Sequence, residues 1–132
     1  MASIFTKIIQ GEIPCYKIAE DERFFAFLDI NPIAEGHVLV IPKSETDYIF
    51  DLEDDLLSGL TLFAKKIATA IDLSLGTIRT GIIVEGLEVP HAHMHLIPIY
   101  FEEQPFTLSR KIEVKQERMV ELAKLISKAV KQ

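Results

Sequence analysis

Cysteine is almost absent from this 132-residue sequence, in which Cys15 is the only one. A single thiol cannot form an intramolecular disulfide, so a reducing compartment is the natural setting for the protein. Residues 1–7 lack the basic and continuous apolar stretches of a secretory signal, and no apolar run approaches the length that spans a membrane. We therefore expect a cytoplasmic protein without a membrane partner.

An excess of positive charge is absent as well. The sequence holds 14 Lys and Arg against 20 Asp and Glu, which gives a formal net charge of -6 at pH 7. Because no basic patch or basic amphipathic stripe is evident, the composition argues against nucleic acids and anionic membranes as partners. An anionic ligand would have to be held by local donors such as imidazoles or backbone amides.

The sequence also lacks internal repeats, low-complexity tracts and linkers rich in Ser or Pro. We expect one domain over residues 1–132, in which 101–132 form a C-terminal extension that ends in a helix. Apolar runs bounded by turn residues predict strands at 15–19, 24–28, 37–41 and 79–84.

Helical spacing of apolar residues occurs in two places. It runs from Asp51 until Gly76, and it returns from Met119 to Val130. Because strands and helices seldom alternate along the chain, the pattern indicates an α+β domain. We expect a mostly antiparallel sheet, one long helix and a C-terminal helix.

Three of the four histidines alternate with apolar residues in the segment His91-Ala92-His93-Met94-His95. Successive side chains of an extended segment point to opposite faces, so the three imidazoles should share one face of a strand bracketed by Pro90 and Pro98. An imidazole has an unperturbed pKa near 6.5, so an uncharged ring nitrogen is available at neutral pH.

Spacing alone leaves three uses of these histidines open. A central imidazole can attack phosphorus and form a phosphohistidine that water breaks in a second step. His-x-His on a strand with a more distant His37 is also an arrangement found in zinc enzymes. The third use is incidental polar packing.

The string from Val89 to Pro98 resembles the signature of the histidine triad family of nucleotide hydrolases and transferases. Residues 4–14, 27–32 and 36–43 resemble other blocks of that family in the same order, so the resemblance covers about residues 4–98. It implies an antiparallel sheet of about five strands with a long helix, in a homodimer whose sheets join. It also implies attack on the α-phosphate of purine nucleoside 5′-phosphate conjugates, of the phosphoramidate, acyl-AMP or dinucleoside polyphosphate type, through a nucleotidyl-histidine.

The resemblance also implies roles for single residues. His93 matches the nucleophile, and its ring is oriented by the backbone carbonyl of His91. His95 matches the residue that hydrogen-bonds the phosphate and the leaving group, and His37 matches a support behind the triad. Asp29 matches the acceptor for the ribose hydroxyls. The apolar slot for the base matches Ile4, Phe5, Ile8, Phe27, Ile30 and Leu39.

The sequence departs from the family in the segment before the triad. Leu87 stands where many active relatives carry a glutamine that contacts the phosphate, and a leucine side chain cannot donate a hydrogen bond. Glu88 would repel phosphate if it were charged and pointed inward, whereas the backbone amide of Gly86 can supply part of the missing contact. A nucleotide-binding module with little or no catalysis is therefore the alternative to an active hydrolase.

A second departure concerns metal. Some relatives hold a structural zinc through a pair of cysteines near the N-terminus, and the matching positions are Ser3 and Thr6. Neither residue supplies a thiolate. We therefore expect no metal and no other cofactor, and a His-ligated metalloenzyme is the less favoured third interpretation.

Overall fold

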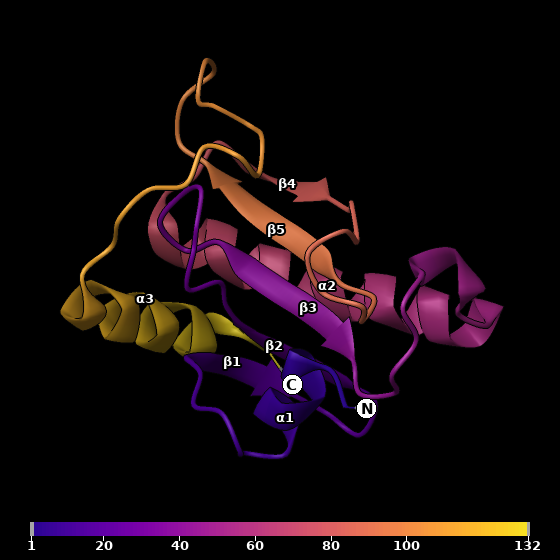
Figure 1. Cartoon of the computed structure of the whole chain (residues 1–132). Coiled ribbons are helices and arrows are strands. Elements are labelled where there is room, and N and C mark those ends of the chain that lie inside the picture. Colours follow the sequence, from indigo (N-terminus) through magenta and orange to yellow (C-terminus); the bar gives the residue numbers. More distant parts are fainter. Residues whose placement is uncertain (1, 132) are drawn as a thin grey trace.

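The computed structural model describes residues 2–131. Its elements are α1 (Ile4–Ile9), β1 (Lys17–Glu20), β2 (Phe24–Leu28), β3 (Val38–Pro42), a single 3₁₀ turn (Ile49–Asp51), α2 (Asp54–Leu75), β4 (Arg79–Ile83), β5 (Met94–Ile99) and α3 (Gln116–Ala129). The strands form one five-stranded sheet in the order β1-β2-β3-β5-β4 (Figure 1). All of its pairings are antiparallel, which confirms the α+β prediction.

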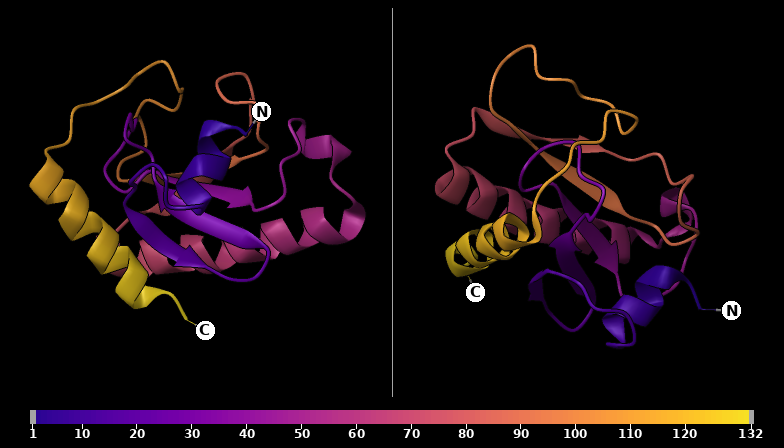
Figure 2. Two further views of the ribbon diagram at one scale, coloured as in Figure 1. Left: turned by 60° about the horizontal axis from the view of Figure 1, so that its bottom comes forward. Right: turned by 60° about the vertical axis from the view of Figure 1, so that its left-hand side comes forward.

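The central strands β2 and β3 are buried on both faces of the sheet, and the strand alternation separates two kinds of environment. On β2, Phe24 and Ala26 pack into the main apolar core with α2, whereas Phe25 and Phe27 pack on the opposite face with Phe5 of α1. Figure 2 shows α1 and α2 on opposite sides of the sheet. The histidines lie on the face that carries α1, because Ala92, Met94 and Leu96 belong to the core under α2.

Helix α2 follows the predicted apolar stripe, of which Leu60, Phe63, Ile67 and Ile71 are buried. It ends at Gly76, whose φ of 65° lies in the left-handed region that glycine adopts without a Cβ penalty. The predicted start at Asp51 is wrong by three residues, since Asp51 closes the short turn and the helix begins at Asp54.

Helix α3 confirms the predicted C-terminal helix. Its buried residues are Met119, Leu122, Ala123 and Ile126, and all four belong to the same core as the α2 stripe. The helix packs against α2 and β1, so the extension after β5 completes the main core. Within residues 2–131, no helix is both long enough and apolar enough to cross a membrane.

Two further features differ from the sequence expectations. Helix α1 was not predicted, although Ser3 caps it by accepting a hydrogen bond from the Thr6 amide, which is a helix-start signal readable in the sequence. The histidine strand begins later than expected: β5 starts at Met94 and contains Pro98. Pairing with β3 ends at Leu96, so the missing N–H of Pro98 costs no hydrogen bond to β3.

Candidate active site

A pocket of about 190 Å³ lies between α1 and the sheet face that carries the histidines. This volume is below the ~300–1,000 Å³ of pockets that enclose whole drug-sized ligands, so the pocket fits one portion of a larger ligand. Every residue of the predicted apolar slot lines it, together with Asp29, His93 and His95: the slot residues are Ile4, Phe5, Ile8, Phe27, Ile30 and Leu39.

The slot has a buried floor and an exposed rim. Phe5, Phe27 and Leu39 are buried, whereas Ile4 and Ile30 are 50% and 70% exposed. The Phe5 ring meets the Phe27 ring edge to face at 5.5 Å between centroids, and it meets the His93 ring in the same way at 5.2 Å. An apolar slot therefore leads directly to the central imidazole.

Both ring nitrogens of His91 are engaged by protein groups. Its Nε2 lies 2.8 Å from the carbonyl oxygen of Pro42, which can only accept, so Nε2 carries the proton. Its Nδ1 therefore accepts from the hydroxyl of Ser3 at 2.8 Å. Ser3 and Thr6 in turn contact the carboxylate of Glu45. The ring of His91 is thus fixed from both ends and has no free nitrogen.

His93 leaves one nitrogen free. Its Nδ1 lies 2.7 Å from the backbone carbonyl of His91, so Nδ1 donates and Nε2 carries the lone pair. This is the hydrogen bond that the resemblance implied. Among the described residues, Nε2 of His93 has no hydrogen-bond partner, and the ring lines the pocket.

His37 and His95 form a hydrogen-bonded pair with a fixed direction. The backbone N–H of Ile33 donates to Nδ1 of His37 at 3.1 Å, so His37 carries its proton on Nε2. That proton is donated to Nδ1 of His95 at 2.9 Å, so His95 carries its own proton on Nε2. Nε2 of His95 is buried and has no protein partner within residues 2–131. A hydrogen-bond donor is therefore available to a ligand beside His93.

Burial keeps these imidazoles uncharged. It lowers the pKa of His37 and of His95 to about 3, with a further decrease from the neighbouring imidazole in each case. Burial also lowers the pKa of His91 and that of His93. The lone pair on His93 is consequently available without deprotonation at neutral pH.

A metal site fits this arrangement poorly. Asp29, His37 and His95 bring ligand-type atoms within 4.8 Å of one another. However, the Ile33 amide directs the proton of His37 to the nitrogen that faces His95, and that nitrogen therefore offers no lone pair to a metal ion. Of the four imidazoles, only His93 has a free lone pair, whereas zinc sites need three or four protein ligands.

Asp29 lies at the inner end of the slot and is 8% exposed. Its Oδ1 accepts from the backbone N–H of Asn31 at 2.8 Å, and its Oδ2 lies 3.5 Å from Nε2 of His37. Burial raises the pKa of this carboxyl, and the Asn31 hydrogen bond opposes that rise. A carboxylate at this point can accept hydrogen bonds from a polar group at one end of an otherwise apolar ligand.

Gly86 and Leu87 do not line the pocket with Asp29. They line a second hollow of about 300 Å³, which also contains Tyr48, Phe50 and His93. Leu87 is 86% exposed, and Gly86 has a φ of 76°. His93 therefore lies between the apolar slot and this second hollow, so a ligand at His93 can extend to either side.

Several pocket residues were not identified as site residues from the sequence. Lys111 lines the pocket from the C-terminal extension, and its Nζ lies 3.5 Å from Oε2 of Glu88. Cys15 also lines the pocket, where burial raises the pKa of its thiol. No sequence pattern pointed to Lys111, because 70 or more residues separate it from Asp29 and the slot in a segment without periodicity.

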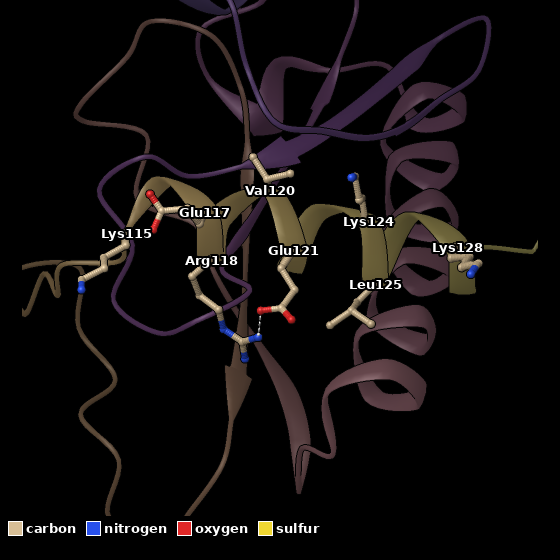
Figure 3. A pocket seen from close by; sticks show the side chains of 8 residues that line it. All are labelled: Lys115, Glu117, Arg118, Val120, Glu121, Lys124, Leu125 and Lys128. Atoms are coloured by element: carbon tan, nitrogen blue, oxygen red, sulfur yellow. Dashed lines mark hydrogen bonds and ion pairs between the residues drawn. The ribbon is translucent and has the colours of Figure 1, made fainter.

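A larger groove of about 690 Å³ lies away from the histidines, along the outer side of α3 (Figure 3). Its residues are mostly charged, and Arg118 pairs with Glu121 at 2.5 Å within it. The same guanidinium also pairs with Glu35. None of the residues lining this groove is a histidine, a cysteine or a hydroxyl-bearing residue, so the groove carries no candidate for covalent chemistry.

Comparison with known proteins gives relatives in sequence and in fold. An uncharacterized HIT-like protein of Borreliella burgdorferi is 38% identical over 133 residues, covering 94% of this chain and 95% of the relative. An adenosine 5′-monophosphoramidase of Saccharomyces cerevisiae is 42% identical over 98 residues, covering 74% of this chain but only 62% of the yeast protein. The crystal structure of a Zn-bound histidine triad family protein from Mycobacterium smegmatis matches with a TM-score of 0.85 at 29% identity, covering 98% of this chain and 94% of the other.

The family model named HIT domain matches residues 10–102, a range that contains β1 to β5, His37 and the alternating histidines. This range and the aligned relatives agree with the resemblance that the histidine string suggested. The chain therefore belongs to the histidine triad (HIT) family.

Proposed function

We propose that this protein is a hydrolase or nucleotidyl transferase that attacks the α-phosphate of purine nucleoside 5′-phosphate conjugates. The observation that carries the proposal is the single free imidazole lone pair, on Nε2 of His93, beside the unpartnered N–H of His95. A lone pair on one ring and a donor on the next suit an electrophile that gains negative charge as it reacts. The similarity to a yeast adenosine 5′-monophosphoramidase supports the same class of substrate.

The reaction has two steps at phosphorus. Nε2 of His93 forms a bond to the α-phosphorus as the bond to the leaving group breaks, and the N–H of His95 donates a hydrogen bond to the phosphate or the leaving atom. A carboxylate or phosphate departs as an anion, whereas an amine departs with a proton that it takes from solvent. Water then forms a P–O bond, the P–N bond to His93 breaks, and the proton of the water passes to solvent.

The pocket supports a nucleoside as the rest of the substrate. Phe5, Phe27 and Leu39 enclose a flat apolar ring and offer few polar groups that would distinguish one purine from another. Base selectivity should therefore be loose, with purines preferred over pyrimidines by modest factors. We regard free AMP-type small molecules as the partners of this site, rather than nucleic acid, because the net charge of -6 gives no general attraction to a polyanion.

The direct test is incubation with an adenosine phosphoramidate, followed by intact-mass measurement and an assay for released AMP. Turnover, with a covalent nucleotidyl adduct trapped by rapid acid-free quenching, is the expected result. Tight AMP binding without adduct or turnover would favour a nucleotide-binding module instead, as the exposed Leu87 in place of a hydrogen-bond donor suggests.

Asp29 provides a test of how the sugar is bound. Changing Asp29→Asn replaces an acceptor-only carboxylate by an amide, and we expect kcat/KM for a ribonucleotide phosphoramidate to fall by ~10–100-fold, since hydrogen bonds to a charged group contribute ~1.5–3 kcal/mol. With the 2′,3′-dideoxy analogue of that phosphoramidate, which lacks both ribose hydroxyls, kcat/KM of Asp29→Asn should stay close to that of the wild type. An equal loss with both substrates would mean that Asp29 acts on the histidines and not on the ribose.

The exposed edge of the sheet supports a homodimer. Strand β4 pairs only with β5 in the described part of the chain, and Ile78, Ile82 and Val84 in or beside it are exposed. An unpaired apolar strand edge favours association with a second copy.

We expect a dimer in sedimentation equilibrium. The substitution Ile82→Lys should shift the equilibrium toward monomer, whereas Leu125→Lys on α3 should not. A monomeric wild type would contradict the joined-sheet arrangement.

A further inference from the structure

The segment between β5 and α3 returns across the molecule to the histidine pocket. Figure 1 shows it beside the connection between β2 and β3. Leu108 of this segment is buried against Ile33 and Ile97, and the amide of Ile112 donates to the carbonyl oxygen of Pro32 at 2.8 Å. Lys111 lies between these two anchors, so its backbone position is fixed relative to the pocket.

The side chain of Lys111 completes the pocket wall beside Asp29 and His95. Its positive charge contributes to the lowered pKa of His37 and that of His95, which agrees with a position near those two rings. The ammonium group is the only cationic side chain among the residues that line the pocket. It therefore brings to the site a charge that the overall composition of the chain does not supply.

Lys111 forms only a weak ion pair, with Glu88. Its Nζ lies 3.5 Å from the carboxylate of Glu88, and the two side chains are 36% and 54% exposed. Ion pairs with this exposure contribute ~0–1 kcal/mol, so exchanging the carboxylate for another anion costs little. Glu88 also follows directly after Leu87, so the ion pair lies next to the position that lacks a side-chain donor.

We infer that Lys111 binds the phosphate group of the nucleotide in this pocket and exchanges Glu88 for it. The inference rests on the proposed function, because it uses the same pocket and the same class of ligand. A phosphate with one or two negative charges attracts the ammonium group at least as strongly as a single carboxylate does. The ammonium group supplies the phosphate with a hydrogen-bond donor, which the side chain of Leu87 cannot do. Its positive charge also offsets the negative charge of Glu88.

Binding of AMP and of adenosine, measured by calorimetry at low salt, tests the inference without requiring turnover. The wild type should bind AMP ~10-fold or more tightly than adenosine, as expected for one charge-assisted hydrogen bond. Lys111→Met should remove most of this preference, leaving the part that the N–H of His95 supplies, and should leave adenosine affinity unchanged, whereas Lys111→Arg should retain most of the preference. Lys115→Met is the matched control, since Lys115 lies four residues further along and outside the pocket.

A substitution at Glu88 provides a second test. Its effect on AMP affinity should depend on Lys111 if Lys111 binds the phosphate, but not if Lys111 has only a structural role. Glu88→Gln should tighten AMP binding in the wild-type background, because the ammonium group loses its competing partner. The same change should tighten AMP binding less in the Lys111→Met background, where it removes only the repulsion between Glu88 and the phosphate. Increasing salt should weaken AMP binding to the wild type more than to Lys111→Met.

Two results would overturn the inference: AMP bound no more tightly than adenosine by the wild type, or a preference for AMP that is as large in Lys111→Met as in the wild type. Failure of the proposed enzymatic activity is distinguishable from both. A protein with a Lys111-dependent preference for AMP, but without adduct or turnover, would refute the enzyme and retain the phosphate-binding role of Lys111.

Discussion

Changing His93→Asn is expected to abolish the covalent adduct and to reduce turnover of adenosine phosphoramidate by ~10⁴–10⁶-fold, the range seen when an enzymatic nucleophile is removed. The reason is the distribution of protons: the lone pairs of His91, His37 and His95 accept hydrogen bonds from Ser3, Ile33 and His37, respectively. None of them can replace the lost nitrogen. Rapid-quench kinetics and intact mass measure the two effects separately.

His95→Asn is the matched control for this experiment. It removes the free N–H beside the proposed nucleophile but keeps Nε2 of His93, so the adduct should still form, ~10²–10³-fold more slowly. Adenosine binding should persist in both variants, because the apolar slot does not depend on either imidazole lone pair. An adduct that forms at the wild-type rate in His93→Asn would assign the nucleophile to another residue.

The alternation of the histidines was readable because the period of a strand is fixed by backbone geometry. His91, His93 and His95 share one face and Ala92, Met94 and Leu96 share the other, even though the first two histidines precede β5. The apolar slot was readable only through the resemblance, since Phe5 and Phe27 are equally consistent with an ordinary core. Both proved to line the pocket.

The proton positions were not readable from the sequence. They depend on three backbone groups, the carbonyls of Pro42 and His91 and the amide of Ile33, which come from three separate segments. Lys111 was missed for a related reason. Its arrival at the pocket depends on the packing of Leu108 and on one backbone hydrogen bond to Pro32, neither of which follows from a local pattern.

Four buried neutral imidazoles also link the site to the stability of the fold. Apolar side chains at these positions would be less costly to bury. A buried imidazole is tolerated only while it is uncharged, because burial of its charged form costs folding free energy. At neutral pH, the hydrogen bonds from Ile33 and Ser3 satisfy Nδ1 of His37 and Nδ1 of His91. Acidification therefore acts on the folded protein through the same groups that supply the proposed chemistry.

Stability is expected to fall steeply as the pH decreases from about 6.5 toward 3. In the unfolded chain, His37 and His95 take up protons near pH 6.5, whereas in the folded protein their pKa is about 3. The unfolded state binds more protons within this window, so the free energy of unfolding falls as the pH decreases and is unaffected by these two groups above it. Two such groups contribute about 3 kcal/mol per pH unit, which is large against a typical stability of ~5–15 kcal/mol.

Urea unfolding measured between pH 7 and 4.5 checks this slope before most carboxylates titrate. The raised pKa of Asp29 acts in the opposite direction, because the folded state then binds a proton before the unfolded state does, so the observed slope is reduced near the acidic end. His37→Asn keeps an acceptor for Ile33 and a donor for His95 but removes one titrating group. It should therefore reduce the slope by the contribution of one proton, about 1.4 kcal/mol per pH unit. A slope that is the same in His37→Asn as in the wild type would mean that the acid sensitivity arises outside this histidine pair.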